Sequence, residues 1–168
     1  MKRYTAFISG LAALALISLA PTAFAGIKQE SGSFDVTYVK RDFQPIAEGH
    51  NLMLSESTGT NNGGSLDGFS VSVRETVDLD KGNGSNSGYV IFARGDDLQI
   101  VRINGKVMTT MKDGHPNTAL AGTWEAVDAK GSLAGTKGEG TFSGYFTAED
   151  KYHIDWKGTS TKPQASAN

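Results

Sequence analysis

Hydrophobic and polar residues alternate in short runs along most of the chain after residue 25. Phe34, Val36 and Tyr38, for example, alternate with polar residues, which is the period-two pattern of a strand with one buried face. The one helical candidate, residues 116–121, is too short to affect the fold. The alternation predicts nine strands, at residues 34–40, 46–57, 69–78, 89–94, 98–103, 106–111, 122–127, 140–147 and 151–159.

Residues that favour turns separate these runs. Residues 59–68 and 80–88 are rich in glycine and asparagine and predict flexible loops, and residues 41–45 predict a turn that ends in proline. Asn104-Gly105 lies between two alternating runs, and this dipeptide is the strongest short signal for a hairpin turn.

The short links between consecutive strands indicate an antiparallel meander. Closure of the meander into a barrel removes the exposed edges that an open sheet of this size would have to protect. We therefore predict an all-β fold, a single antiparallel eight-stranded β-barrel that is closed or nearly closed. An immunoglobulin-like sandwich is the alternative, but its Greek-key connections need longer links. The alternation predicts an inner wall of Phe34, Tyr38, Leu52, Val71, Ile91, Ile100, Phe142, Phe146 and Trp156.

The first 25 residues have the layout of a secretory signal. Lys2 and Arg3 precede an apolar run, and Ala23 and Ala25 are small residues at the two positions that a signal peptidase recognises. The apolar run has about 14 residues, fewer than the roughly 20 that cross a bilayer. We expect cleavage after Ala25 and a periplasmic or secreted product without a membrane anchor. The expected parts are a signal peptide (1–25), a flexible lead-in (26–33), a barrel domain (34–160) and a polar tail (161–168).

Composition limits the classes of function. The residues that remain after cleavage fit one domain with one core, and the chain has no cysteine, so disulfides are excluded. Without Lys2 and Arg3, 14 basic residues stand against 18 acidic ones. This mild negative balance gives no electrostatic reason to bind nucleic acid or an anionic membrane.

Glycine-rich segments in the last third of the chain carry a family resemblance. They are Gly122-Thr123-Trp124-Glu125, residues 131–135 (Gly-Ser-Leu-Ala-Gly) and residues 137–142 (Lys-Gly-Glu-Gly-Thr-Phe). Together with residues 88–97 they resemble a family of small bacterial secreted proteins related to allene oxide cyclase and the plant dirigent proteins. The resemblance implies an eight-stranded barrel of the calycin or allene oxide cyclase type with a cavity, often in a dimer or trimer.

This resemblance has departures and carries no catalytic residue. Lys130 stands where the family pattern usually has threonine, and Thr136 where it usually has isoleucine. No catalytic position of allene oxide cyclase aligns with a residue here, so the resemblance does not imply the plant reaction.

Glu75 is the main candidate for chemistry. It continues the face of a predicted strand that carries Phe69, Val71 and Val73. A carboxyl group on an apolar barrel wall resists ionisation, which raises its pKa toward the range that suits a general acid or base. Alternatively, the strand leaves the core at Glu75 and the carboxylate is solvated near the barrel mouth.

Other polar groups form no recognisable motif. His153 and Asp155 share a face of the last predicted strand and could orient each other, although such outer residues are usually just solvated. The three histidines lie far apart in no ligand spacing, and residues 78–89 lack the glutamate that ends a calcium loop. We therefore expect no metal and no cofactor.

Three functions remain open for the predicted barrel. It could bind a small apolar ligand, act as a cofactor-free cyclase or isomerase with Glu75 as its acid or base, or be a packed structural or interaction barrel. The first two functions require a connected void able to hold a drug-sized molecule, roughly 300 Å³ or more, and both fail if the interior has no such void. A homodimer or homotrimer is a possible assembly. The candidate ligand-binding residues are Tyr38, Leu52, Val71, Val73, Phe142 and Trp156.

Overall fold

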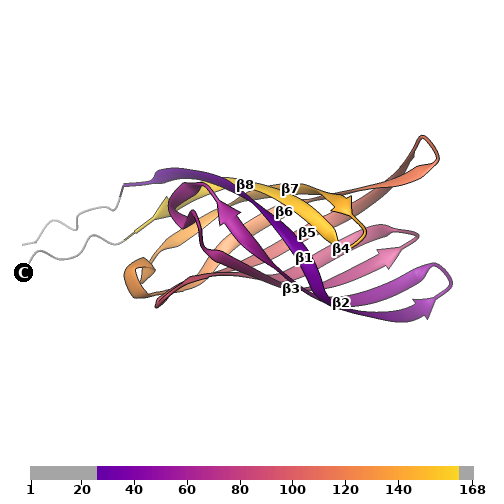
Figure 1. The fold of residues 1–168 in the computed structure, drawn as a ribbon, viewed down its shortest axis with the longest axis horizontal. Coiled ribbons are helices and arrows are strands. Elements are labelled where there is room, and N and C mark those ends of the chain that lie inside the picture. Colours follow the sequence, from indigo (N-terminus) through magenta and orange to yellow (C-terminus); the bar gives the residue numbers. More distant parts are fainter. Residues whose placement is uncertain (1–25, 163–168) are drawn as a thin grey trace, which may run out of the picture.

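The computed structural model describes residues 26–162, which form one closed β-barrel (Figure 1). Each strand pairs antiparallel with the next one along the chain, and β8 pairs back with β1. The barrel therefore has no open sheet edge, and the predicted all-β, antiparallel, eight-stranded barrel is confirmed. The strands are β1 (Lys28–Ala47), β2 (His50–Asn62), β3 (Ser70–Asp80), β4 (Asn83–Arg94), β5 (Asp97–Lys112), β6 (His115–Lys130), β7 (Lys137–Ala148) and β8 (Lys151–Thr161).

The two ends of the barrel differ (Figure 1). At the end that we call the terminus end, β1 begins, β8 ends, and two connections contain short 3-10 helices, η1 (Gly64–Leu66) and η2 (Gly131–Leu133). At the opposite end, the hairpin end, tight turns join β1 to β2, β3 to β4, β5 to β6 and β7 to β8. The β1–β2 and β5–β6 hairpins project furthest from the barrel body at this end.

Alternate residues of all eight strands fill the interior. Val71, Val73, Phe142 and Trp156 are buried and face inward, as the alternation predicts. Tyr38 is partly buried and packs against the same core. Burial of this single core is the main stabilising contribution, because apolar area removed from water contributes roughly 25 cal/mol per Å².

The predicted lead-in and the first predicted turn are both strand. Residues 28–33 begin β1 and pair with residues 155–160 of β8. Residues 41–45 continue β1 beyond a bulge, and Pro45 lies opposite Asn51. Both segments lack the regular apolar spacing that would have revealed them, because polar residues, glycine and proline occupy their positions.

Two further segments were predicted as something other than strand. Residues 83–88, expected within a flexible loop, begin β4, and the β3–β4 turn is confined to Lys81 and Gly82. The helical candidate at residues 116–121 lies within β6. The signal peptide and the end of the polar tail lie outside the described residues.

The predicted hairpin turn at Asn104-Gly105 is wrong. Strand β5 continues through this dipeptide, and its turn comes at Asp113-Gly114, where both residues have positive φ (51° and 80°). Gly105 instead serves packing, since a Cβ atom there would lie 2.6 Å from Asn86 Oδ1, 2.7 Å from the backbone oxygen of Ala121 and 2.8 Å from the ring of Phe142. Two predicted strands therefore merge, and nine become eight.

Three residues of the predicted inner wall face outward. Leu52 lies on the opposite face of β2 from Met53, which is buried. Ile91 and Ile100 pair with each other across β4 and β5 on the outer surface. In each of these strands apolar side chains occupy both faces, as in residues 89–92, so alternation does not identify the inner one.

Aromatic rings fit into the interior because they lie across glycines of neighbouring strands. A Cβ atom at Gly122 would come within 2.7 Å of the Phe142 ring, which also covers Gly105. A Cβ atom at Gly158 would come within 2.6 Å of the Trp124 ring. Glycine is therefore required at these positions to give the rings room.

The two loops at the terminus end are alike. Residues 64–68 and 131–135 both read Gly-Ser-Leu-x-Gly, and both glycines of each loop have positive φ. In each loop a carboxylate accepts the backbone N–H of the serine, Glu30 in the first (3.1 Å) and Asp97 in the second (2.5 Å). Glu30 precedes Asp97 by the same number of residues as the first loop precedes the second. The barrel thus contains two similar halves, β1–β4 and β5–β8.

We predict that Gly105→Ala lowers the free energy of unfolding by about 1–3 kcal/mol, because the added methyl group overpacks against Asn86 Oδ1, the backbone oxygen of Ala121 and the Phe142 ring. Urea unfolding followed by circular dichroism measures the change. Ser143→Ala, at an exposed position of β7, is the control and should stay within about 0.5 kcal/mol of the wild type. An unchanged midpoint for Gly105→Ala would show that the ring does not need this glycine.

Candidate functional site

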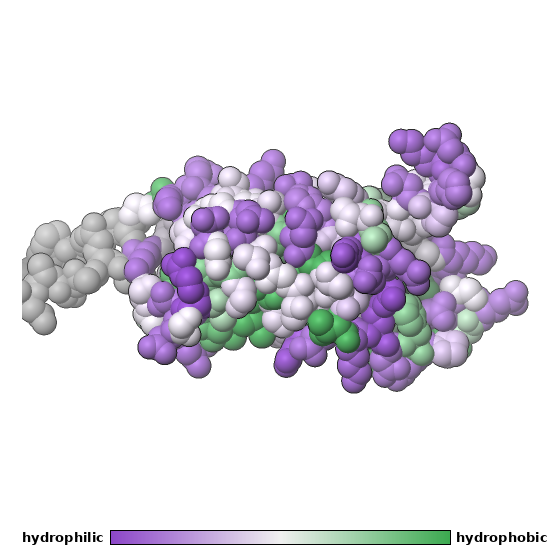
Figure 2. Space-filling model, viewed as in Figure 1, coloured by the Kyte–Doolittle hydropathy of each residue, from purple (hydrophilic) through white to green (hydrophobic). Residues whose placement is uncertain are grey.

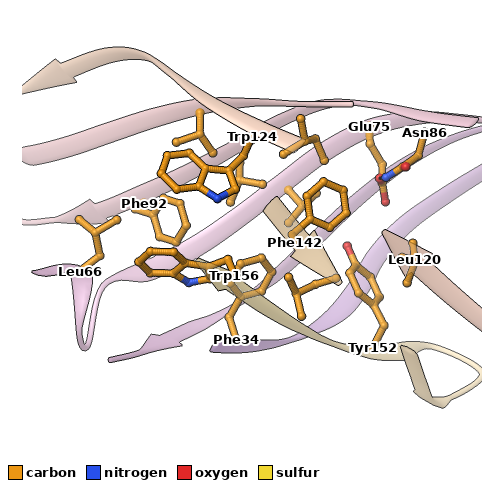
Figure 3. Close-up of a pocket in the computed structure, with 15 residues that line it drawn as sticks. Phe34, Leu66, Glu75, Asn86, Phe92, Leu120, Trp124, Phe142, Tyr152 and Trp156 are labelled. Carbon is orange, nitrogen blue, oxygen red and sulfur yellow. The ribbon is translucent and has the colours of Figure 1, made fainter. Parts of the chain in front are cut away.

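A cavity of about 60 Å³ lies in the barrel interior (Figure 3). Its walls are mainly apolar and include both tryptophans of the chain, Trp124 and Trp156, whose ring centroids are 6.0 Å apart. Polar side chains line one part of it, namely Glu75, Asn86 and Tyr152. The other lining residues are Phe34, Leu66, Val73, Val90, Phe92, Val101, Ile103, Leu120, Phe142 and Ile154.

The volume of this cavity limits what it can hold. One water molecule needs roughly 10–15 Å³ of such space, a cavity of roughly 150 Å³ accepts benzene, and drug-sized ligands need roughly 300 Å³ or more. At about 60 Å³ the cavity does not meet the condition set for a drug-sized ligand, so that form of the first two functions is wrong, and the closed barrel has room only for a very small molecule. A larger ligand would require side chains of the wall to rotate away.

Glu75 lies at the inner wall of β3, on the face that also carries Val71 and Val73. Its side chain is buried (7% exposed), so the alternative of a solvated carboxylate at the barrel mouth is wrong. Asn86 on the neighbouring β4 donates from Nδ2 to Glu75 Oε2 at 2.9 Å. Ser55, opposite Glu75 on β2, lies close enough to influence the carboxyl group, although the contact falls short of hydrogen-bond geometry.

Burial is the largest influence on Glu75 and raises its pKa, because the apolar surroundings disfavour the charged form. Asn86 and Ser55 stabilise the carboxylate and oppose this effect without cancelling it. The fold therefore favours a neutral carboxylic acid, which has an O–H to donate as well as an oxygen that accepts.

Two tyrosines extend this polar cluster toward the hairpin end. The Tyr152 hydroxyl donates to Ser57 Oγ at 3.3 Å, and the Tyr152 and Tyr38 ring centroids are 5.3 Å apart. Burial, and after it the nearby Glu75 carboxyl group, raise the pKa of both tyrosines. Both phenols therefore keep their protons and act as hydrogen-bond donors at neutral pH.

Two buried oxygens of the cluster are left without a hydrogen-bond partner among residues 26–162. They are Asn86 Oδ1 and Ser55 Oγ. An unsatisfied buried polar group costs about 1–3 kcal/mol, and such a group in a native fold calls for an explanation. Here both flank the one carboxyl group that lines the cavity.

The structure brings together part of the predicted site. Glu75, Val73, Phe142 and Trp156 line the cavity. The remaining predicted residues do not line it: Val71 and Tyr38 point inward but pack elsewhere in the core, and Leu52 faces outward.

Sequence reasoning missed three polar members of the cluster. Asn86 fell in a predicted loop, Ser55 lay on the face of its strand that was expected to point outward, and Tyr152 was interpreted as plain core. A signal for Asn86 was present, because it alternates in register with Val90 and Phe92 along β4. Gly88, the inward position between Asn86 and Val90, has no side chain and interrupts this pattern.

His153 lies outside the barrel, on the opposite face of β8 from Tyr152. Its Nδ1 contacts Asp35 at 2.9 Å and its Nε2 contacts Asp155 at 3.3 Å. The hydrogen bond to Asp35 is the main cause of its raised pKa. Within the described part of the chain, no three acidic or histidine side chains converge in a way that could hold a metal ion.

One face of the barrel is mainly polar on its outer side. Figure 2 shows hydrophilic residues over most of the visible face, with hydrophobic residues between them and near the hairpin end. None of the helices within residues 26–162 has the length and apolar character needed to cross a membrane.

Comparison with known proteins gives no assignment by sequence. No family model matches the chain, and no curated protein matches it. Among solved structures, the chain is similar to a pterocarpan synthase dirigent protein, with a TM-score of 0.43 and 8% identity, over 93% of this chain and 100% of that chain. A likeness at this level carries no inference about function.

We predict that Glu75→Gln changes how stability depends on pH. Burial raises the pKa of Glu75 above its ordinary value of 4.5. Above pH 4.5, Glu75 therefore loses its proton in the unfolded protein but keeps it in the folded protein, which favours unfolding. The wild type should then lose stability relative to Glu75→Gln by up to about 1.4 kcal/mol per pH unit, until the folded pKa is reached. Below pH 4.5 the difference should be constant.

Urea unfolding between pH 4 and pH 8 measures this difference. Glu139→Gln, which removes an exposed carboxyl group, is the control and should show no such divergence. Parallel stability curves for the wild type and Glu75→Gln would contradict the raised pKa.

Proposed function

We propose that the protein binds one small, mainly apolar molecule inside the barrel, with a polar group of the ligand against Glu75 and Asn86. The observation that carries this proposal is the pair of buried oxygens, Asn86 Oδ1 and Ser55 Oγ, that find no hydrogen bond within the described chain. Asn86 lines the polar part of a cavity whose other walls are apolar, and Ser55 lies behind it, beside Glu75. An apolar pocket with a few convergent polar groups is the usual form of a small-molecule site.

A hydroxyl group is the polar group that suits this site best. It can donate to Asn86 Oδ1, and it can accept a hydrogen bond from the neutral carboxyl group of Glu75. The rest of the ligand would then lie against the ring of Phe142 and the side chains of Val73 and Ile103. Such a molecule would satisfy a buried acceptor and remove apolar area from water at the same time.

The proposal includes the place where the protein acts and the family to which it is related. Residues 1–25 have the layout of a secretory signal, which supports a periplasmic or secreted protein. The segments at residues 122–125 and 131–142 support a relation to the allene oxide cyclase and dirigent barrels. A homodimer or homotrimer belongs to the same proposal.

We predict that xenon and 2-propanol bind inside the barrel, because the first fits a small apolar void and the second adds a hydroxyl group. Methyl NMR titration should give saturable shifts for Val73, Val90 and Ile103, which line the cavity. Val101→Ile should weaken binding of both probes about threefold or more, since it fills part of the void. Ile100→Val changes the outer face of the same strand and is the control.

Absence of saturable shifts with both probes would contradict the proposal. The protein would then be the packed structural or interaction barrel of the sequence analysis. Shifts that Val101→Ile leaves unchanged would place the bound probe outside the cavity, and this too would contradict the proposal.

A cofactor-free cyclase or isomerase is the second candidate function. The observation that favours it is the burial of Glu75, which keeps a proton available inside a cavity that largely excludes water. In such a reaction Glu75 would give its proton to an oxygen of the substrate and recover one as the product forms. The barrel would contribute restriction of the substrate conformation.

For any substrate that the protein turns over, we predict that Glu75→Gln lowers kcat by about 10²–10⁴-fold, because the amide cannot supply the proton. Binding of the substrate should change much less, since glutamine keeps the shape and one acceptor. Turnover measured beside equilibrium binding separates these effects, with Glu139→Gln as the control. Unchanged turnover would eliminate the acid–base role of Glu75.

A further inference from the structure

The terminus end of the barrel is closed by buried hydrogen bonds. The fully buried Asn61 side chain donates to the backbone oxygens of Gly63 (3.0 Å) and Leu66 (2.9 Å), and it accepts from Trp156 Nε1 (2.8 Å). This network holds Leu66 of η1 against the core, where it is 8% exposed and lines the cavity. Opening this end would break several bonds at once and leave their groups unpaired in the interior.

Glu30 reinforces the same closure. Its carboxylate, 8% exposed as a residue, accepts from the backbone N–H of Ser65 (3.1 Å) and from Ser160 Oγ (3.2 Å), and it pairs with Lys28 (3.1 Å). These contacts tie η1 to both the first and the last strand. The terminus end is therefore held closed by buried hydrogen bonds between η1 and the strands.

The hairpin end is closed differently, by three aromatic rings. Tyr38, Phe146 and Tyr152 contact one another with centroid distances of 5.3 to 6.3 Å. Tyr152 also lines the cavity. We call these three residues the aromatic gate. Tyr152 is held in place by its hydrogen bond to the buried Ser57. Tyr38 and Phe146 make no side-chain hydrogen bond within residues 26–162, so rotation of either ring opens a path without leaving a buried polar group unpaired.

Arg41 lies over this gate from the solvent side. Its guanidinium carbon is 5.1 Å from the centroid of the Tyr38 ring, and its Nη1 donates to the backbone oxygen of Glu149 in the β7–β8 turn (3.2 Å). Arg41 is exposed. It therefore bridges the ring and the turn through contacts that water can replace.

Exposed apolar side chains lie beyond the gate on the two hairpins that project furthest. Phe43 is 54% exposed and pairs in register with Met53, which is buried in the core. Met111 is 69% exposed and lies on the same face of β5 as Val107, which is also buried. The inner wall of the barrel thus continues outward as an apolar rim that an apolar molecule can contact first.

We infer that an apolar ligand enters and leaves the cavity through the hairpin end, by movement of the aromatic gate, and that Arg41 is the latch that limits this movement. The inference rests on the proposed function. It follows from the difference between the two ends, since one is sealed by buried hydrogen bonds and the other by rings and an exposed cation.

Xenon exchange in the wild type and in three variants tests the route. Arg41→Ala should raise the exchange rate of bound xenon about threefold to tenfold, measured by xenon exchange spectroscopy, while its dissociation constant changes less than twofold. Arg41→Lys keeps the charge and should give a smaller increase. Lys40→Ala, the neighbouring exposed residue of β1, should leave the rate unchanged.

Glu30→Gln loosens the terminus end and distinguishes the two routes. It should leave xenon exchange within twofold of the wild type. Faster exchange in Glu30→Gln with no effect of Arg41→Ala would overturn the inference and leave ligand binding intact. A wild type that binds no xenon would overturn the proposed function, and the entry route with it.

Discussion

The width of the barrel is the constraint on which the rest of the structure depends. Eight strands leave an interior that side chains nearly fill, yet this protein places two tryptophans and several phenylalanines there. The rings fit only because glycines lie beneath them, as Gly105 and Gly122 do beneath Phe142. What remains is a cavity of about 60 Å³. The same packing that stabilises the barrel therefore sets the size of anything that it can hold.

The two halves of the barrel use this interior differently. Glu75 follows the loop at residues 64–68 by the same number of residues as Phe142 follows the loop at residues 131–135. Both side chains point inward. In the first half, Ser55 and Asn86 stand beside Glu75 and form a polar cluster. In the second half, the corresponding wall carries Phe142 among glycines. A polar wall that faces an aromatic wall across a small void is an arrangement that orients an amphipathic molecule.

The sequence predicts the fold better than the site, for a physical reason. Where one face of a strand is apolar and the other polar, as around Val71, alternation identifies the inner face and places Glu75 correctly. Alternation does not identify the inner face where glycine lies inside, as at Gly105, or where both faces are apolar, as at Ile91. Asn86 alternates in register with Val90 and Phe92, but it lies in a polar, glycine-rich run that favours a loop, so the sequence does not place its side chain inward.

Glu75 is difficult to explain by the needs of folding alone. Burial makes its charged form unfavourable, so at neutral pH it weakens the fold relative to a neutral side chain of the same shape. A glutamine could keep the contact with Asn86 without this penalty. The carboxyl group differs from glutamine in one chemical respect, which is that it can release and recover a proton. A residue that weakens the fold and offers a proton within an apolar cavity is what the proposed function requires, whereas the packing of the barrel alone does not require it.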